Sequence, residues 1–406
     1  MKEIIGGVTA AKGYKAAGIY AGIKRKRKDL ALVYSTVAAK GAGTFTTNVV
    51  KAAPVKWDMK VTKESTYVQA VVLNSGVANA CTGMLGEENN YLMAEAVGAA
   101  LNIPTEAVYT ASTGVIGKQL PIEVIVNGIK QIVTELSDTP EAGSLAAQAI
   151  MTTDTYSKEC AVSFMVGDKE VTVGGMAKGS GMIHPNMATL LGVITTDLAI
   201  SKELLQAALS EDVQNTFNMI SVDRDTSTND SIFLLANGLA GNPEITEKNE
   251  EYHNFCKALN IVTTKLAKML AGDGEGASKL LEVTVTGAAS KEEAVTLSKA
   301  IICSNLVKTA LFGNDANWGR IMCAMGYSGV SFDPDAVDLI IESTEGKLQL
   351  AENGLATDYS EEFATKILSA EEVKVLVELK QGEAAATAWG CDFTYDYVKI
   401  NADYRS

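Results

Sequence analysis

The feature that most constrains the fold is the alternation of strand-like and helix-like segments along the chain, which follows no fixed repeat. Short β-branched and apolar runs are typical of strands, whereas apolar residues spaced three and four apart indicate helices. Strands are expected near residues 31–35, 67–73, 161–166, 170–173, 190–195, 232–235, 282–286, 338–342, 373–379 and 391–399, and helices near residues 87–101, 121–136, 201–217, 247–271 and 290–302. Because these segments do not alternate one for one, they predict an α+β fold of packed layers rather than a doubly wound parallel sheet. A change in composition near residue 280 indicates a smaller C-terminal unit.

Charge and composition narrow the possible partners and locations. The formal net charge is −14, so the chain repels phosphate backbones and we expect no nucleic acid among its partners. The basic run 24–28 is predicted to be a solvated loop before a strand. No stretch approaches about 18 uninterrupted apolar residues, and the N-terminal segment lacks an apolar secretory core, so we expect no membrane span and no secretory signal. The six cysteines form no C-x-x-C pair, which argues against a zinc ribbon or disulfide framework and favours a cytoplasmic location.

Scarce histidine and incomplete motifs exclude several classes of active site. The chain has two histidines, His184 and His253, so a multi-histidine metal site is not expected and a histidine-based triad has little choice of base. The glycine-rich segment 272–279 does not match the phosphate-binding P-loop. The acidic run 223–230 begins like a calcium loop but lacks its glycine and its final glutamate. Two interpretations of that run remain: a hydrogen-bonded turn, or a divalent ion held by Asp223, Asp225 and Asp230.

One segment, residues 178–192, combines a glycine-rich polar loop with a threonine that opens an apolar strand. One interpretation is an ordinary junction between loop and strand. The other is an N-terminal nucleophile, in which the Thr189 hydroxyl attacks the Ala188 carbonyl and the resulting ester hydrolyses. The new chain would begin with Thr189, whose α-amine has a reference pKa of about 8 and can act as general base. These residues alone leave both interpretations open.

The segment 182–191 closely resembles the self-cleavage site of the ornithine acetyltransferase family, the arginine-biosynthesis enzymes that move acetyl from N-acetylornithine to glutamate. Further motifs similar to that family occur in order at residues 6–10, 46–48, 74–83, 112–117, 223–230, 313–320 and 389–406. The resemblance therefore covers essentially the whole chain. One departure is Ala316, where the family leads us to expect proline; it concerns a turn and no catalytic group.

The resemblance implies a layered αββα sandwich and a set of site residues. Thr189 would be the self-cleavage and acetyl-accepting nucleophile, and Thr113 and Gly114 the oxyanion hole. Substrate contacts are implied for Thr155, Lys178, Thr189, Glu275, Asn401 and Ser406. In this scheme Lys178 suits a substrate carboxylate, and Glu275 the amino end of ornithine. His184 is expected to hold the cleavage loop rather than act as a base.

The same resemblance implies processing into residues 1–188 and 189–406, which stay together as two copies of each. It implies a two-step ping-pong transfer without a metal or cofactor. Family members differ in whether acetyl-CoA is also a donor, and we expect that it is one here. Two rival hypotheses remain: an N-terminal-nucleophile amidohydrolase or aminopeptidase of the same fold, and an uncleaved binding protein. Retention of the nucleophile and oxyanion-hole motifs argues against the second.

Overall fold

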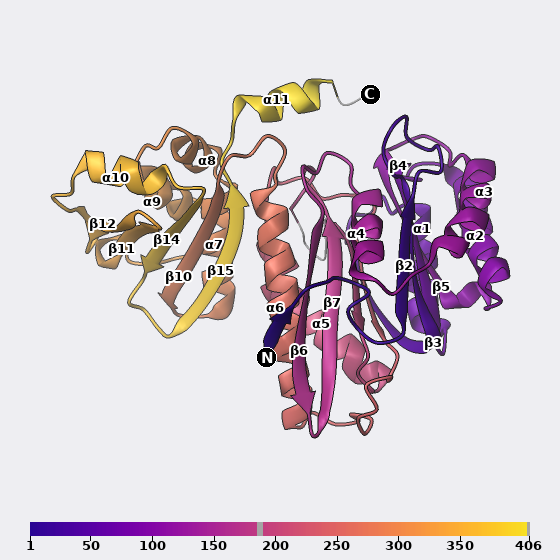
Figure 1. Cartoon of the computed structure of the whole chain (residues 1–406). Coiled ribbons are helices and arrows are strands. Elements are labelled where there is room, and N and C mark those ends of the chain that lie inside the picture. The colour runs from indigo at the N-terminus through magenta and orange to yellow at the C-terminus, as the bar shows by residue number, and fades with distance from the viewer. Residues whose placement is uncertain (185–189, 404–406) are drawn as a thin grey trace. The chain divides into compact units, whose positions relative to one another are not determined.

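The computed structural model describes residues 1–184 and 190–403 and divides the chain into two compact units (Figure 1). The first unit contains Met1–Gly179, the described residues 190–218, and Thr226–Leu266. The second contains Ser180–His184, Met219–Asp225 and the described residues from Ala267 onward.

The first unit is built on two sheets that share one long strand. Its strands are β1 (Lys2–Ile4), β2 (Tyr14–Ile19), β3 (Leu30–Phe45), β4 (Val68–Val77), β5 (Val108–Val115), β6 (Lys158–Val166), β7 (Lys169–Lys178), β8 (Leu191–Thr196) and β9 (Ser231–Ala236). The first half of β3 pairs with β2 and β4, and its second half, from Lys40 to Phe45, pairs with β9. The strand order is β1-β6-β7-β8-β9-β3-β4-β5, with β2 on β3. β4 and β5 are parallel, and so are β8 and β9. Within each pair the carboxyl ends of the two strands therefore lie at the same edge of the sheet.

Helices cover the outer faces of both sheets, which gives four layers. The inner faces meet in one apolar core that includes Tyr14, Val71 and Phe233. The outer face of the β3–β4–β5 region packs against α2 (Gly83–Leu101) and α3 (Ile122–Ile132). On the other sheet, a Cβ built on Gly175 of β7 would touch side chains of α6 (Glu250–Gly272). The unit also contains α1 (Ala53–Glu64), α4 (Pro140–Ala149), α5 (Lys202–Asn215) and the short 3₁₀ helices Thr105–Ala107 and Val133–Glu135. A further 3₁₀ helix, Phe217–Met219, begins in this unit and ends at the first residue of the next segment, which belongs to the second unit. The expected α+β fold with an αββα sandwich is confirmed.

The second unit has one mixed sheet with helices around it. Its strand order is β13-β12-β11-β14-β10-β15. The strands are β10 (Leu280–Ala288), β11 (Asp338–Ser343), β12 (Gly346–Glu352), β13 (Leu355–Ala356), β14 (Glu372–Glu378) and β15 (Ala384–Cys391). The helices are α7 (Lys291–Cys303), α8 (Asn305–Phe312), α9 (Trp318–Gly326), α10 (Glu361–Leu368), α11 (Tyr395–Ala402) and the 3₁₀ helix Pro334–Ala336. β10 and β14 run parallel, and their residues alternate between buried and partly exposed, as expected where one face is packed.

In the described part of the chain no single helix meets the length and hydropathy criteria for crossing a membrane. The bent pair α7–α8 meets them jointly, by length and composition alone.

Most predicted elements are confirmed. β6 and β7 pair as an antiparallel hairpin, and the Ser201 hydroxyl accepts from the Leu204 N–H and caps α5. The predicted strand over 391–399 is wrong, because β15 ends at Cys391 and α11 begins at Tyr395. The Thr394 side chain accepts from the Asp396 N–H and caps this helix. Sequence patterns missed β1, β2, β5, β12, β13, β15, α1, α4, α8, α9, α10 and α11.

Candidate active site

The carboxyl ends of β4 and β5 approach each other closely at Gly114. Gly76 and Gly114 are paired across the two strands, and Gly114 has a φ of +129°, which side chains other than glycine's rarely allow. A Cβ on Gly114 would lie 2.3 Å from the carbonyl carbon of Gly76. Glycine is therefore required for this approach, which fixes the peptide groups around Thr113 and Gly114. A fixed backbone N–H beside a hydroxyl can stabilise a developing oxyanion.

Lys178, the last residue of β7, brings an ammonium group to this turn. Its side chain is buried, with 8% of the residue exposed, and Nζ donates a hydrogen bond to Thr113 Oγ1 at 3.3 Å. Three residues implied by the family resemblance, Thr113, Gly114 and Lys178, are thus neighbours in the fold although 65 positions separate Thr113 from Lys178. An ammonium beside an oxyanion turn can hold the carboxylate of a bound amino acid.

Asp154 is a buried carboxylate that the sequence did not point out. It accepts hydrogen bonds from Lys158 Nζ at 2.8 Å, from the Gly179 N–H at 2.8 Å and from the Thr152 N–H at 3.0 Å. Burial raises its pKa, but the charges of Lys178 and Lys158 and these hydrogen bonds outweigh burial and hold the pKa at about 2. Asp154 is therefore ionised at neutral pH and balances part of the positive charge of the two lysines.

Asn229 joins the segment before β9 to the ends of β4 and β5. Its Nδ2 donates to the carbonyl of Ala78 at 2.5 Å and to that of Ser112 at 2.8 Å, and its Oδ1 accepts from the Thr228 hydroxyl. The carbonyl of Ser112 belongs to the peptide group that precedes Thr113. Asn229, which is 6% exposed, therefore orients the backbone on which the candidate oxyanion hole depends.

The basic run 24–28 lies in a loop, as predicted, but the prediction that it is solvated is wrong for Lys24 and for Lys28, whose Nζ donates to the Gly18 carbonyl at 3.1 Å. Lys24 is half-buried, and its Nζ donates to the Met151 carbonyl at 3.0 Å. Burial lowers its pKa to about 8; Asp29 opposes the shift, whereas Arg27 and Lys178 add to it. Since Lys178 contributes to this shift, the two lysines lie within range of each other's charge.

The second unit holds two further predicted residues together. Glu275 is buried, and its Oε2 accepts from Asn401 Nδ2 of α11 at 2.7 Å, while its backbone N–H donates to the Ser180 carbonyl. A Cβ built on Gly181 would lie 2.3 Å from the carboxyl carbon of Glu275, so only glycine leaves room for the carboxylate there. Both the backbone and the carboxylate of Glu275 are therefore held in place.

The acidic run 223–230 forms a hydrogen-bonded turn around Asp223. The carboxylate of Asp223 accepts from the backbone N–H groups of Met182 and Ile183 at 2.6 and 2.8 Å, and from the Tyr397 hydroxyl at 3.3 Å. Burial, and then the charge of Asp223, raise the pKa of Tyr397 above its usual range, so it stays a donor. Among the described residues no group of three or more His, Cys, Asp or Glu side chains could hold a metal ion. The turn interpretation is confirmed, and the divalent-ion interpretation is not supported.

His184 has structural partners within the second unit. Its Nδ1 lies 3.1 Å from Ser221 Oγ and 3.6 Å from Cys303 Sγ. Burial, and then the charges of Lys299 and Arg224, lower its pKa to about 4. The imidazole is therefore neutral and weakly basic at physiological pH, which favours the expected supporting role over that of a general base.

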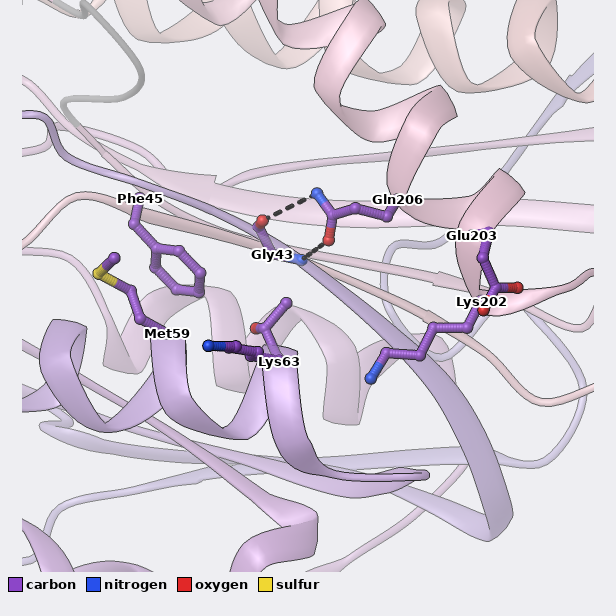
Figure 2. A pocket seen from close by; sticks show the side chains of 8 residues that line it. Gly43, Phe45, Met59, Lys63, Lys202, Glu203 and Gln206 are labelled. Atoms are coloured by element: carbon purple, nitrogen blue, oxygen red, sulfur yellow. Dashed lines mark hydrogen bonds between the residues drawn. The ribbon is translucent and has the colours of Figure 1, made fainter.

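A separate cavity of about 480 Å³ in the first unit contains none of the predicted site residues. Figure 2 shows its walls, with the Gln206 amide of α5 hydrogen-bonded to both backbone groups of Gly43 at 3.0 Å. Lys202 at its rim donates to the Ser65 carbonyl. The lining residues are Gly43, Phe45, Met59, Thr62, Lys63, Lys202, Glu203 and Gln206. These groups attach α5 to β3 and α1.

Comparison with known proteins decides the family. The profile of the ArgJ family matches residues 15–406. The chain belongs to the ArgJ family. It is 50% identical over 396 residues to the arginine biosynthesis bifunctional protein ArgJ of Thermotoga neapolitana, covering 97% of this chain and 99% of that one. It is also 50% identical to the protein of the same name from Caldanaerobacter subterraneus, over the full length of both. A crystal structure of the ArgJ protein of Bacillus halodurans, 48% identical, covers 51% of this chain and 96% of its own, with a TM-score of 0.49.

The family expected from the motifs is thereby confirmed, and the chain is an enzyme of the ArgJ family. Within the described residues the predicted site residues form two groups, Thr113, Gly114 and Lys178 in the first unit and Glu275 and Asn401 in the second. Thr155 is exposed and follows Asp154 directly in the first unit. Ala188, Thr189 and Ser406 lie outside the described residues. The sequence signal for the missed residues was indirect, since Asp154 precedes Thr155, Asn229 lies in the acidic run, and Lys24 opens the basic run.

Proposed function

We propose that this protein transfers acetyl from N2-acetylornithine to glutamate through an acetyl-Thr189 intermediate. The observation that carries the proposal is the contact of Lys178 with Thr113 beside the Gly114 turn, because it joins a carboxylate-binding cation to a candidate oxyanion hole. Leu191, two positions after Thr189, pairs with Lys178 across β7 and β8.

The proposed reaction has two balanced steps. The Thr189 hydroxyl attacks the acetyl carbonyl and gives its proton to the Thr189 α-amine, while Thr113 and Gly114 stabilise the oxyanion. The bond from the acetyl carbon to nitrogen breaks, the proton passes to the leaving amine, and ornithine departs. The amine of glutamate then attacks the acetyl ester, loses a proton to the same base, and restores the Thr189 hydroxyl. Both amino acids share an α-carboxylate, so Lys178 serves both steps.

Maturation by self-cleavage is part of the same proposal. The Thr189 hydroxyl would attack the Ala188 carbonyl, and hydrolysis of the resulting ester would free the α-amine that the transfer requires. The products, residues 1–188 and 189–406, would remain associated, since β8 and β9 lie in the same sheet as β3 and β7. The family resemblance adds an assembly with two of each, a heterotetramer.

The finer assignments follow from the family and are proposed with it. Two relatives carry the name bifunctional protein, and an ornithine acetyltransferase from Mycobacterium tuberculosis, 45% identical, was crystallised with ornithine. We therefore propose that this chain also takes acetyl from acetyl-CoA as a second donor and transfers it to glutamate, which gives N-acetylglutamate. We also assign catalysis without a metal or cofactor, and action in the cytoplasm. Thr155, Glu275, Asn401 and Ser406 complete the proposed substrate contacts.

The intact mass of the purified protein, measured under denaturing conditions with N-terminal sequencing, tests the nucleophile. Two fragments of about 20 and 23 kDa, scaled by residue count, are expected, one of them beginning Thr189-Leu190-Leu191. A single chain of 42.8 kDa would contradict self-cleavage. Counting labelled acetyl on glutamate against free acetate then separates a transferase from a hydrolase, because water would release acetate.

A further inference from the structure

We propose that Lys24 is a second cation of the substrate site and, with Lys178, holds the α-carboxylate of the amino-acid substrates. The inference rests on the proposed function and extends it to a residue outside the family motifs described above. The ligand of Lys24 would be the carboxylate of a free or N-acetylated amino acid, whereas its sequence context predicted only a solvated charge.

The two lysines contact different residues of the turn formed by the ends of β4 and β5. Lys24 packs against Gly76, where a built Cβ would come within 3.0 Å of the Lys24 Cγ. Gly76 in turn is the residue that Gly114 approaches most closely. From the other direction Lys178 Nζ donates to Thr113 Oγ1. The contacts therefore run from Lys24 through Gly76 and Gly114 to Thr113 and Lys178.

The loop that carries Lys24 is built to keep its shape. Asp29 is fully buried, and its carboxylate accepts from the backbone N–H groups of Ala21, Gly22 and Lys24 at 2.6, 3.2 and 2.8 Å. The Arg25 carbonyl accepts from the Tyr20 hydroxyl at 3.3 Å. Lys24 is thus fixed at both its backbone and its ammonium, which donates to the Met151 carbonyl and has two further N–H donors.

The local balance of charge favours an anionic ligand. Lys24, Lys158 and Lys178 each interact electrostatically with the carboxylate of Asp154, and Lys24 also interacts with that of Asp29, so these three ammonium groups outnumber the two carboxylates. Like charges held in a partly buried site repel each other, and a carboxylate between two of them relieves that repulsion. Both N2-acetylornithine and glutamate bring such a carboxylate, so one pair of lysines can serve both half-reactions.

Steady-state kinetics of Lys24→Met test the assignment, because methionine keeps the apolar stem on Gly76 and removes the charge. Loss of a hydrogen bond to a charged group is expected to raise the KM values of N2-acetylornithine and glutamate about tenfold or more, with kcat unchanged. Lys24→Arg is expected to recover most of the loss. The KM of acetyl-CoA, which carries no carboxylate, is expected to stay unchanged.

A substrate without the carboxylate distinguishes binding from packing. Wild-type enzyme is expected to have a lower KM for glutamate than for its α-amide. In Lys24→Met the ratio of these two KM values is expected to fall by the same factor by which the KM for glutamate rises. Lys26→Met, a change at an exposed neighbour in the same basic run, is the matched control and is expected to behave as wild type.

Three results would overturn the assignment: KM values in Lys24→Met equal to those of the Lys26→Met control, a raised KM with an unchanged preference for acid over amide, or a rise confined to acetyl-CoA. Failure of the proposed function shows itself separately, as wild-type protein that transfers no acetyl to glutamate. In that case calorimetric titration with ornithine tests the role of Lys24. Lys24→Met should bind ornithine about tenfold more weakly than the wild type, and equal Kd values would refute the role.

Discussion

Replacing Gly114 by alanine adds one methyl group at the closest backbone approach of the candidate site. The new Cβ would lie 2.3 Å from the Gly76 carbonyl carbon and 2.5 Å from its oxygen. Since both are backbone atoms, the ends of β4 and β5 must separate by about 1 Å to reach normal van der Waals contact. The φ of +129° adds strain of about 1–2 kcal/mol. With about 1–3 kcal/mol for overpacking, we expect the free energy of unfolding of the first unit to fall by about 2–5 kcal/mol.

The same displacement moves the N–H and hydroxyl groups that the proposed reaction needs. A shift of about 1 Å in a catalytic group lowers kcat about 100-fold, so Gly114→Ala is expected to fold, to lose stability and to be nearly inactive. Guanidinium denaturation followed by tryptophan fluorescence and circular dichroism measures the first effect, and the rate of acetyl transfer measures the second.

Gly117→Ala is the matched control for this prediction. Gly117 also has a positive φ, +81°, but a Cβ there would meet no atom within 4 Å. It is expected to show the backbone strain of about 1–2 kcal/mol and to keep its kcat. If Gly114→Ala kept wild-type kcat and was no less stable than Gly117→Ala, the close approach of β4 and β5 would not be what positions the oxyanion hole.

Four other changes test separate parts of the site. Thr189→Ala is expected to remain one chain by mass spectrometry and to transfer no acetyl; a cleaved, active variant would remove Thr189 as nucleophile. Lys178→Ala should raise the KM of both amino acids, and unchanged kinetics would exclude it from the site. The pKa of Asp154 is lowered to about 2 from 3.8, so its stabilising effect of about 2 kcal/mol is complete above pH 4 and is lost as the pH falls towards 2. Acid unfolding of Asp154→Asn should lack that dependence, and an unchanged curve would refute the assignment. Asn229→Ala leaves two buried carbonyls without their donor and should lower kcat about tenfold with KM retained, so an unchanged kcat would contradict its positioning role.

The layered fold was predictable because buried apolar residues recur along the chain at the spacing typical of a strand or of a helix. The core strands and long helices carry apolar residues at spacing two, or three and four, and they were placed correctly. The error over residues 391–399 has a local cause. Phe393, Tyr395 and Tyr397 alternate as in a strand, yet Phe393 and Tyr397 are also four apart, and their ring centroids lie 4.9 Å from each other.

Contacts distant in sequence decide between those two patterns. The Thr394 hydroxyl donates to the carbonyl of Gly276, and a Cβ on Gly276 would overlap the backbone of α11 at Tyr397. Neither contact is visible in a local window of sequence. They begin the helix at Tyr395 and bring Asn401, one turn after Tyr397, to the Glu275 carboxylate. The family motifs could group Glu275 with Asn401 because motifs record the outcome of such contacts without showing their cause.

Lys24 illustrates the limit of reading charge from composition. Five consecutive basic residues in a chain of net charge −14 predict a solvated loop, and Arg25, Lys26 and Arg27 are indeed exposed. What separates Lys24 from them is the buried carboxylate of Asp29, which binds the Lys24 N–H and turns its side chain onto Gly76. A run of like charges therefore predicts that a segment is exposed on average. The position of each side chain in it depends on which of its backbone groups form hydrogen bonds with the rest of the fold. For this chain the hydrogen bond to Asp29 places Lys24 beside the turn at Gly76 and leaves Arg25, Lys26 and Arg27 in solvent, so the Lys24→Met and Lys26→Met pair measures the difference directly.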